Sequence, residues 1–265
     1  HTNLDNVISG VNGKIADKLN LINRSILSPK QDQLLKLAVF VPIKDADKVR
    51  NAAFQAGAGY IANYSNCSFN LQGKGSFKGE DGSNPVVGEK GKLHFEDEVK
   101  IEVILPTYKK DQILKNIIDQ HPYEEVAYDL YPIKNEFDVG SGIIGELENE
   151  IDPLLFLNNL KKVMQTECIR FTSFNKKKIK KIAVCGGAGS FLLNKAIQVN
   201  ADIFISSDFK YHQFFDADNQ IVIADIGHFE SEQFTIELIA SRLKENFSNF
   251  AVRLTDVKTN PINYL

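Results

Sequence analysis

The sequence predicts an α/β protein in which one α/β domain, residues 1–35 and 135–265, is interrupted by an inserted ferredoxin-like α+β domain, residues 36–134. Two patterns support this prediction. From residue 37 to residue 133, the order β-α-β occurs twice, which is typical of a ferredoxin-like sandwich. After residue 180, buried strands alternate with helices, which implies a largely parallel sheet covered on both faces. A chain of 265 residues has room for one or two domains.

The inserted domain begins with an apolar strand at residues 36–42, which a helix at residues 45–56 follows. Gly57 and Gly59 end that helix, because glycine readily takes the left-handed conformation found after a helix. Residues 99–106 alternate polar and apolar side chains, as a half-buried strand does. The remaining predictions are a helix at 109–119, a strand at 126–133, and loops or a short hairpin in the glycine-rich middle at 73–91.

The surrounding domain opens with a predicted helix at residues 17–25. Three buried strands are predicted later, at residues 181–185, 202–206 and 220–226. A glycine-rich turn leads from the first of these strands into a helix, and a short helix at 211–216 follows the second. Four apolar residues at helical spacing mark a last helix: Ile236, Ile239, Leu243 and Phe247.

Composition excludes several classes of protein. The net charge of −3 gives no electrostatic reason to expect binding to nucleic acid or to an anionic membrane. No apolar stretch of the sequence approaches the roughly 20 residues that cross a bilayer. Cys67, Cys168 and Cys185 are widely separated and form no C-x-x-C pair, so burial as reduced thiols in a cytoplasmic protein is the simplest account.

A histidine and a glutamate follow the last predicted strand. His228 and Glu232 are four residues apart, so a helical turn points both side chains to one side. Such a pair can hold a divalent metal, and Asp5 can bring a third ligand. Alternatively His228 belongs to a turn and Glu232 to a helix cap, and the spacing alone favours that interpretation.

Two successive predicted strands end in aspartate and histidine. Asp208 and His212 follow one strand, and Asp225 and His228 follow the next. Polar groups at the carboxyl ends of parallel strands face the crevice where α/β proteins bind ligands. The turn at residues 186–190 matches neither common phosphate-binding pattern, so a tight crossing is favoured over a dinucleotide site.

The other chemical motifs are weaker. His94 is a single imidazole near a predicted loop, and residues 121–125, His-Pro-Tyr-Glu-Glu, are predicted to form a turn between a helix and a strand. No G-x-S-x-G motif is present, so a serine nucleophile is not expected.

Five ordered segments together resemble one family. They are His1–Asp5, Cys185–Ser190, Ser207–His212, Asp225–Glu232 and Asn260–Leu265. The chain resembles, over nearly its whole length, the NGG1-interacting-factor-three-like proteins, also called GTP cyclohydrolase type 2 homologues or dinuclear metal centre hexameric proteins. The insert is similar to the PII-like or CutA-like domain of longer bacterial members, through four segments: Gly57–Gly59, Asn66–Phe69, Gly88–Gly91 and His121–Glu125.

The resemblance implies two divalent metal ions, zinc or iron, in the cavity of a toroidal homohexamer. Three residues match the family's metal ligands: Asp5, His228 and Glu232. Three more match polar positions around the cavity, which we expect to be catalytic: His1, Asp208 and His212. The family's remaining ligands, a His-His pair, come from an N-terminal segment of about one hundred residues. We expect that segment to precede His1 in the intact protein, since the chain does not begin with Met.

The implied chemistry is hydrolytic. Two metals lower the pKa of a bridging water and produce hydroxide near neutral pH. His212 or His1 then moves protons, since imidazole titrates in that range. This chemistry suits the opening of a purine ring or the cleavage of a phosphoester, and the resemblance points to a nucleotide substrate. The alternative is a non-enzymatic metal-binding or regulatory hexameric scaffold whose insert senses a ligand.

Overall fold

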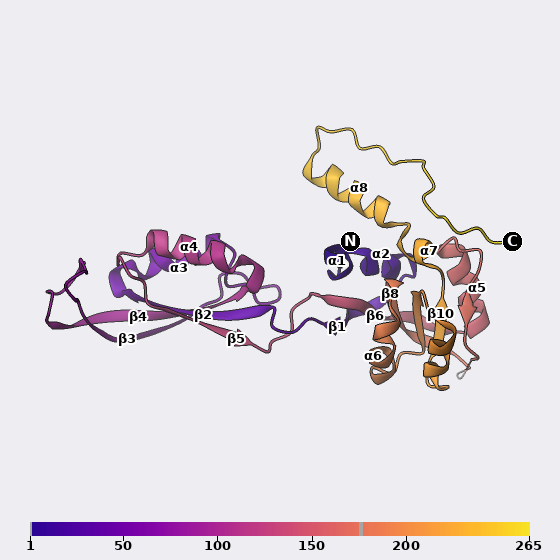
Figure 1. Ribbon diagram of the computed structural model, residues 1–265, viewed down its shortest axis with the longest axis horizontal. Coiled ribbons are helices and arrows are strands. Elements are labelled where there is room, and N and C mark those ends of the chain that lie inside the picture. The colour runs from indigo at the N-terminus through magenta and orange to yellow at the C-terminus, as the bar shows by residue number, and fades with distance from the viewer. Residues whose placement is uncertain (1, 175–176) are drawn as a thin grey trace. The chain divides into compact units, whose positions relative to one another are not determined.

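The computed structural model describes residues 2–174 and 177–265 (Figure 1). These residues form two compact units, one made of the chain up to Lys30 together with Asp138–Leu265, and the other of Gln31–Phe137. Each unit has its own sheet and its own apolar core. The protein is therefore a mixed α/β protein with two separate sheets.

The first unit is built around a six-stranded sheet with the order β1-β6-β8-β9-β10-β7. In chain order its strands are β1 (Ile22–Pro29), β6 (Gly140–Ile151), β7 (Arg170–Phe171), β8 (Ile179–Ala188), β9 (Ile203–Ser207) and β10 (Val222–Asp225). Strands β8, β9 and β10 are parallel to one another, whereas β1, β6 and β7 pair antiparallel. The prediction of a largely parallel sheet is therefore wrong. The prediction rested on the alternation of strands and helices from β8 to β10, which are parallel. It could not include β1, because this strand is mainly exposed or half-buried and lacks a long apolar run.

The opening helix lies earlier in the chain than predicted. α2 spans Val11–Lys18 rather than residues 17–25, and residues 22–25 belong to β1. The helix ends where Asn20 takes a left-handed conformation with φ 53° and the Leu21 N–H donates back to the Ala16 carbonyl. Asparagine tolerates this conformation better than most residues, and apolar spacing does not report it.

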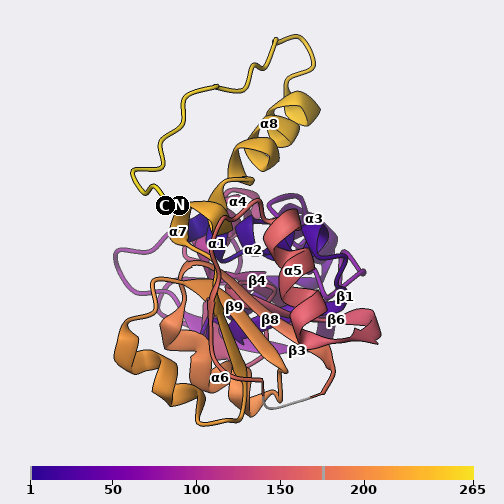
Figure 2. The same cartoon turned by 90° about the vertical axis from the view of Figure 1, so that its right-hand side faces the viewer.

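Helices cover both faces of the first sheet, as predicted (Figure 2). On one face, Ile15 of α2 and Leu160 of α5 (Pro153–Val163) pack against the strands. On the other face, Leu193 of α6 (Leu193–Gln198) packs with the alternate strand residues, such as Phe204. The shorter helices are α1 (Thr2–Asp5), α7 (His228–Glu232) and the 3₁₀ helices η3 (Ser190–Leu192) and η4 (Tyr211–Ala217).

The second unit is a four-stranded antiparallel sheet with the order β3-β4-β2-β5, packed on two helices. Its elements are β2 (Leu34–Pro42), η1 (Ile43–Asp45), α3 (Ala46–Gln55), β3 (Phe69–Lys78), β4 (Leu93–Pro106), η2 (Thr107–Lys109), α4 (Lys110–Gln120) and β5 (Tyr128–Ile133). Gly57 and Gly59 end α3 with φ of 102° and 77°, as predicted. Residues 73–78, where a loop or a short hairpin was predicted, continue β3, so that β3 and β4 form one long hairpin (Figure 1).

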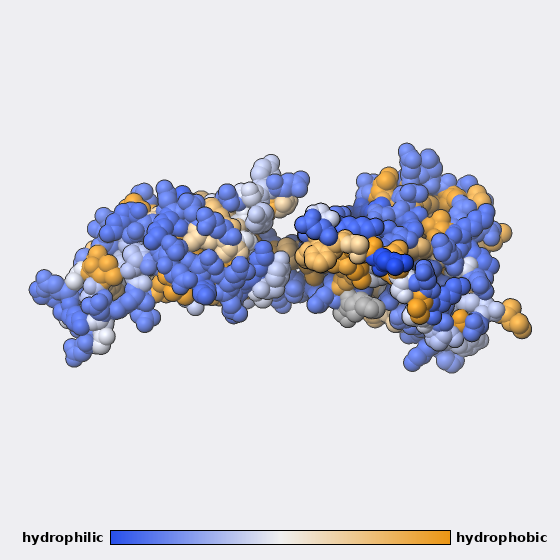
Figure 3. Space-filling model, turned by 90° about the horizontal axis from the view of Figure 1, so that it is seen from above, coloured by the Kyte–Doolittle hydropathy of each residue, from blue (hydrophilic) through white to orange (hydrophobic). Residues whose placement is uncertain are grey.

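The predicted last helix is α8 (Thr235–Asn246), but its apolar stripe is not buried. Ile239 is 47% exposed and Leu243 is 40% exposed. On the face seen in Figure 3, hydrophobic side chains lie in small groups on a mainly hydrophilic surface. None of the helices formed by residues 2–174 and 177–265 combines the length and apolar character that a membrane span needs.

Candidate functional site

An imidazole and two carboxylates meet beyond the ends of β9 and β10. The parallel pairing of these strands places Ser206 opposite Asp225, so the chain leaves both strands at one edge of the sheet. α7 then sets His228 and Glu232 one turn apart, with His228 Nε2 3.7 Å from Glu232 Oε2. On the other side of the ring, His228 Nδ1 is hydrogen-bonded to Asp208 Oδ2 at 2.6 Å. The imidazole is therefore held between two carboxylates.

The Asp225 side chain holds the segments that follow β9 and β10 in place. Its buried carboxylate accepts hydrogen bonds from the N–H groups of Phe209, at 3.0 Å, and Gly227, at 3.1 Å, and it forms an ion pair with Arg170. Gly227 has φ 93°, and a Cβ there would lie 2.2 Å from Glu230 Oε2. The turn into α7 therefore requires glycine, and Asp225 supports the site without facing it.

The glycine turn predicted at residues 186–190 lies directly against the cluster, and its residues 186–188 are the last three of β8. A Cβ on Gly187 would lie 2.6 Å from Glu232 Oε1 and 3.4 Å from His228 Nε2. The Gly187 N–H donates to Ser231 Oγ at 2.8 Å, and the Gly186 N–H donates to Asn12 Oδ1 at 2.8 Å. Because side chains already occupy these backbone donors, the turn does not offer them to a phosphate. It is a close crossing, as the sequence favoured.

Asp5, on α1, belongs to the same electrostatic environment. Burial raises the pKa of the Asp5 carboxyl, against the opposing effect of His228. Burial likewise raises the pKa of Glu232, to which the charge of Asp5 contributes. The hydrogen bond to Asp208 raises the pKa of His228, and Glu232 and Asp5 raise it further. The pKa of the buried Cys185 thiol rises to about 12, because of burial and the nearby Asp5 and Glu232.

The donors in this environment fit a divalent cation in kind. Asp5 Oδ1 is buried and has no hydrogen-bond partner among the described residues, which is the state of an oxygen that a cation would satisfy. Two carboxylates and one imidazole are ligand types that zinc and iron accept. Nevertheless, in residues 2–174 and 177–265 no group of three or more His, Cys, Asp or Glu side chains has converged to metal-holding geometry. The ligand set Asp5, His228 and Glu232 therefore stays a prediction.

Comparisons with known proteins identify the family. Residues 1–261 match the family described as Duf34/NIF3 (NGG1p interacting factor 3). The chain belongs to this family. Two relatives are described as GTP cyclohydrolase 1 type 2 homolog, and each match covers all of this chain and 73% of the relative. The one from Halalkalibacterium halodurans is 38% identical over 271 residues, and the one from Bacillus subtilis is 36% identical over 272 residues. A solved Bacillus cereus protein related to NIF3 is 34% identical, with a TM-score of 0.85, over all of this chain and 72% of that one.

The other catalytic residues predicted for this Duf34/NIF3 chain lie differently. Asp208 contacts His228, as described, whereas His212 is exposed on η4 with its ring against Tyr211 at 5.3 Å. No hydrogen bond or ion pair in the described part of the chain joins His212 to Asp208 or His228. His1 lies outside the described residues.

Two residues that the sequence analysis missed hold the site together. Asn12, on α2, is 1% exposed; its amide donates to the Asp5 carbonyl at 2.8 Å and accepts from the Gly186 N–H. Ser231 accepts from the Gly187 N–H and donates to the His228 carbonyl at 2.8 Å. A polar residue on the apolar face of a helix can indicate such a role. Asn12 could not be recognised in this way, because the helix was predicted at residues 17–25 and Asn12 lies in α2, residues 11–18.

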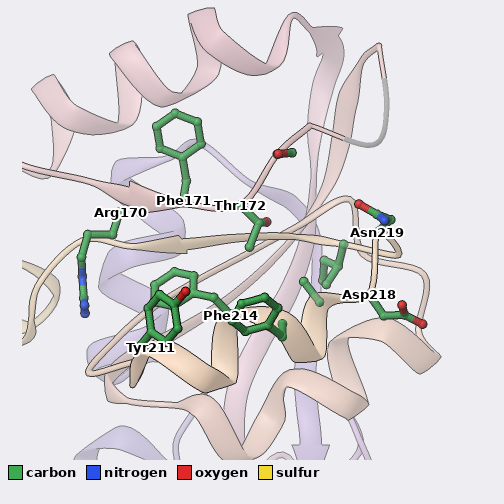
Figure 4. Close-up of a pocket in the computed structure, with 11 residues that line it drawn as sticks. Arg170, Phe171, Thr172, Tyr211, Phe214, Asp218 and Asn219 are labelled. Carbon is green, nitrogen blue, oxygen red and sulfur yellow. The ribbon is translucent and has the colours of Figure 1, made fainter.

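A cavity of about 710 Å³ lies along the β7 edge of the same unit (Figure 4). Its walls include the rings of Phe171, Tyr211 and Phe214, and Arg170 lines it while pairing with Asp225. Asp5, Asp208, His228 and Glu232 do not line it. The cavity is therefore separate from the carboxylate–imidazole cluster.

Proposed function

We propose that this chain binds divalent metal through Asp5, His228 and Glu232, and that it belongs to a dinuclear metal-dependent hydrolase acting on a nucleotide. The observation that carries the proposal is the buried, unpartnered Asp5 Oδ1 in the same electrostatic environment as Glu232 and His228. The description GTP cyclohydrolase 1 type 2 homolog, which two relatives carry, supports a purine nucleotide as substrate. Zinc or iron suits these donors.

Each residue of the cluster has a distinct role in this proposal. Asp5 and Glu232 neutralise the cation, and His228 offers Nε2 as a ligand because Asp208 engages Nδ1. A carboxylate behind a ligating histidine fixes the ring and its tautomer, so Asp208 acts as a positioning residue. His212, which is exposed on η4, or His1 is the imidazole that moves protons. A bound divalent ion supplies Lewis-acid activation of water or of a phosphoryl oxygen.

Three protein donors suffice for one ion in an open site but not for two. A dinuclear centre therefore needs ligands beyond Asp5, His228 and Glu232. We further propose a cytoplasmic homohexamer that binds neither membrane nor nucleic acid, in line with the family resemblance and the net charge of −3.

We infer that the second unit is a ferredoxin-like, PII- or CutA-like domain inserted into the metal-binding one. Its strand order β3-β4-β2-β5, with one helix after β2 and another after β4, supports this assignment. A unit with its own core and its own cavity also supports the alternative function, a regulatory scaffold in which the insert senses a ligand.

Calorimetric titration of the metal-free chain with Zn²⁺ tests the ligand set. We expect Asp5→Asn, His228→Ala and Glu232→Gln each to weaken binding by at least about tenfold, equivalent to about 1.4 kcal/mol. Asp256→Asn, at an exposed position of the C-terminal segment, is the matched control and should bind as the wild type does. Wild-type affinity in all three ligand variants would refute the assignment.

GTP turnover by the protein with its complete set of metal ligands, measured with chelator and after metal is restored, tests the hydrolase. Turnover that disappears on chelation and returns with metal supports the enzyme. Metal binding without turnover of any purine nucleotide would leave the scaffold as the function.

A further inference from the structure

The second unit contains a cavity of about 410 Å³ between the β3–β4 hairpin and the segment that follows α4. That segment, residues 121–125, is the His-Pro-Tyr-Glu-Glu motif for which the sequence predicted a simple turn. Phe77, Tyr123 and Pro85 provide apolar walls. A cavity of this size with apolar walls and a few polar groups is typical of small-molecule sites.

One carboxylate lies inside this cavity because a glycine faces it. Gly75 and Glu98 both line the cavity, and a Cβ on Gly75 would lie 2.2 Å from Glu98 Oε2. The carboxylate of Glu98 therefore takes the space that any other side chain at position 75 would fill. Glu98 is itself half-buried, so its charge is partly removed from water.

Aromatic rings surround this carboxylate. The rings of Phe77 and Tyr123 are 6.0 Å apart, and the ring of His121 lies 5.2 Å from that of Tyr123. Burial raises the pKa of the Tyr123 hydroxyl, and Glu98 raises it further. Burial lowers the pKa of His121. Both groups are therefore neutral at neutral pH and leave the charge of Glu98 uncompensated.

The loop between β3 and β4 covers the cavity. The Asn84 N–H donates to Glu124 Oε1 at 2.6 Å, which ties the loop to the segment after α4. The Gly91 N–H donates to the Gly79 carbonyl at 2.8 Å and closes the loop at its base. Glu124, on the segment after α4, is thus a second carboxylate at the wall of the cavity.

The charges around the cavity select its ligand. Among its described lining residues, Lys78 is the one lysine or arginine. Four lining residues are glutamates: Glu80, Glu98, Glu124 and Glu125. Lys78 lies 3.7 Å from Glu80 and offsets that charge. An anionic ligand would be repelled, and a neutral one would bring no positive charge to Glu98.

We propose that this cavity binds a small organic cation, an amine or amidinium carried on an apolar body. The cationic head pairs with Glu98, and the apolar body packs on Phe77 and Tyr123, where cation–π attraction adds to burial. This site is separate from the metal ligands and does not depend on the function proposed for them.

Calorimetric titration of the full chain with three ligands of one shape tests the proposal: benzamidine, its neutral analogue benzamide, and the anion benzoate. We expect benzamidine to bind one per chain, at least about tenfold more tightly than benzamide, and benzoate not to bind. Glu98→Gln keeps the side-chain shape and should weaken benzamidine binding about tenfold while leaving benzamide binding unchanged. Glu136→Gln, at an exposed position of the same unit, is the control and should bind as the wild type does.

Two results would overturn the proposal. One is benzamidine binding no more tightly than benzamide to the wild-type chain, which needs no variant to fold. The other is undiminished benzamidine binding by a folded Glu98→Gln chain, as judged by its circular dichroism, because the cation would then occupy another site.

Discussion

Replacing Gly187 by alanine tests whether the glycine turn exists to admit the side chain of Glu232. The new Cβ would lie 2.6 Å from Glu232 Oε1, whereas ordinary contact begins at 3.4 Å, so the oxygen must move by 3.4 − 2.6 = 0.8 Å. Metal–ligand distances tolerate only about ±0.2 Å. We therefore expect the variant to bind Zn²⁺ at least about tenfold more weakly than the wild type.

The same substitution also strains the backbone. Gly187 has φ 66°, and a left-handed conformation costs a residue with a Cβ roughly 1–2 kcal/mol. We expect urea unfolding of the metal-free variant to show a loss of that size. The displacement of Glu232 itself should add little, because the carboxylate is the mobile end of its side chain.

The neighbouring glycine provides the control. A Cβ on Gly186 would lie 3.1 Å from Val11 Cγ1 and 3.6 Å from Glu232 Cγ, and its φ lies outside the left-handed range. Gly186→Ala should therefore leave the Glu232 carboxylate in place and Zn²⁺ affinity nearly unchanged. Equal losses of affinity in the two variants, or none in Gly187→Ala, would refute the reasoning.

Three further predictions concern single side chains. Asp5→Asn should raise the free energy of unfolding of the metal-free chain, because it removes a buried charge, and should abolish the stabilisation by added Zn²⁺; urea unfolding with and without metal measures both, and a loss of metal-free stability would contradict the prediction. Burial lowers the pKa of His121, so below about pH 6.5 the unfolded chain binds more protons than the folded chain. The free energy of unfolding, measured in urea, should therefore fall as the pH drops from 7 to 5, and it should fall less steeply in His121→Gln. Equal slopes in the two chains would contradict this. At pH 8 a thiol reagent should label the exposed Cys168 first, while the buried Cys185, with its pKa of about 12, should react only on unfolding; early Cys185 labelling, located by mass spectrometry, would contradict this.

The sequence predicted the parts of the fold that have a clear apolar period. The parallel strands β8 to β10 and the helices α3 and α4 correspond to predicted elements, because continuous apolar runs mark buried strands and 3.6-residue spacing marks helices. β1 escaped prediction because half of its residues are polar and its apolar residues form no long run. The position of α2 was wrong because Asn20, rather than a glycine or proline, ends the helix.

The candidate site was predictable in its strand ends but not in its supports. The His228–Glu232 spacing and the position of Asp208 after a strand are visible in the sequence, and the structure brings these side chains together. The sequence spacing does not reveal the roles of Asn12 and Ser231, because each accepts a hydrogen bond from a backbone N–H far away in the chain. Asn12 is 174 positions from Gly186, and Ser231 is 44 positions from Gly187. The inward carboxylate of Glu98 was equally hidden, because it depends on the glycine opposite it.

The cluster carries a folding cost that a cation would offset. Asp5 and Glu232 are partly buried, and burial raises the pKa of both carboxyls against the opposing effect of His228. Because the pKa of each carboxyl is raised in spite of His228, the charged carboxylates cost the folded chain free energy. A cation that binds the folded chain at 100 times its Kd contributes about 2.7 kcal/mol in return. Asn12 joins the Asp5 backbone to Gly186, the residue before the glycine that faces Glu232. Carboxylates whose charge is disfavoured in the metal-free chain are what the cation site proposed above requires.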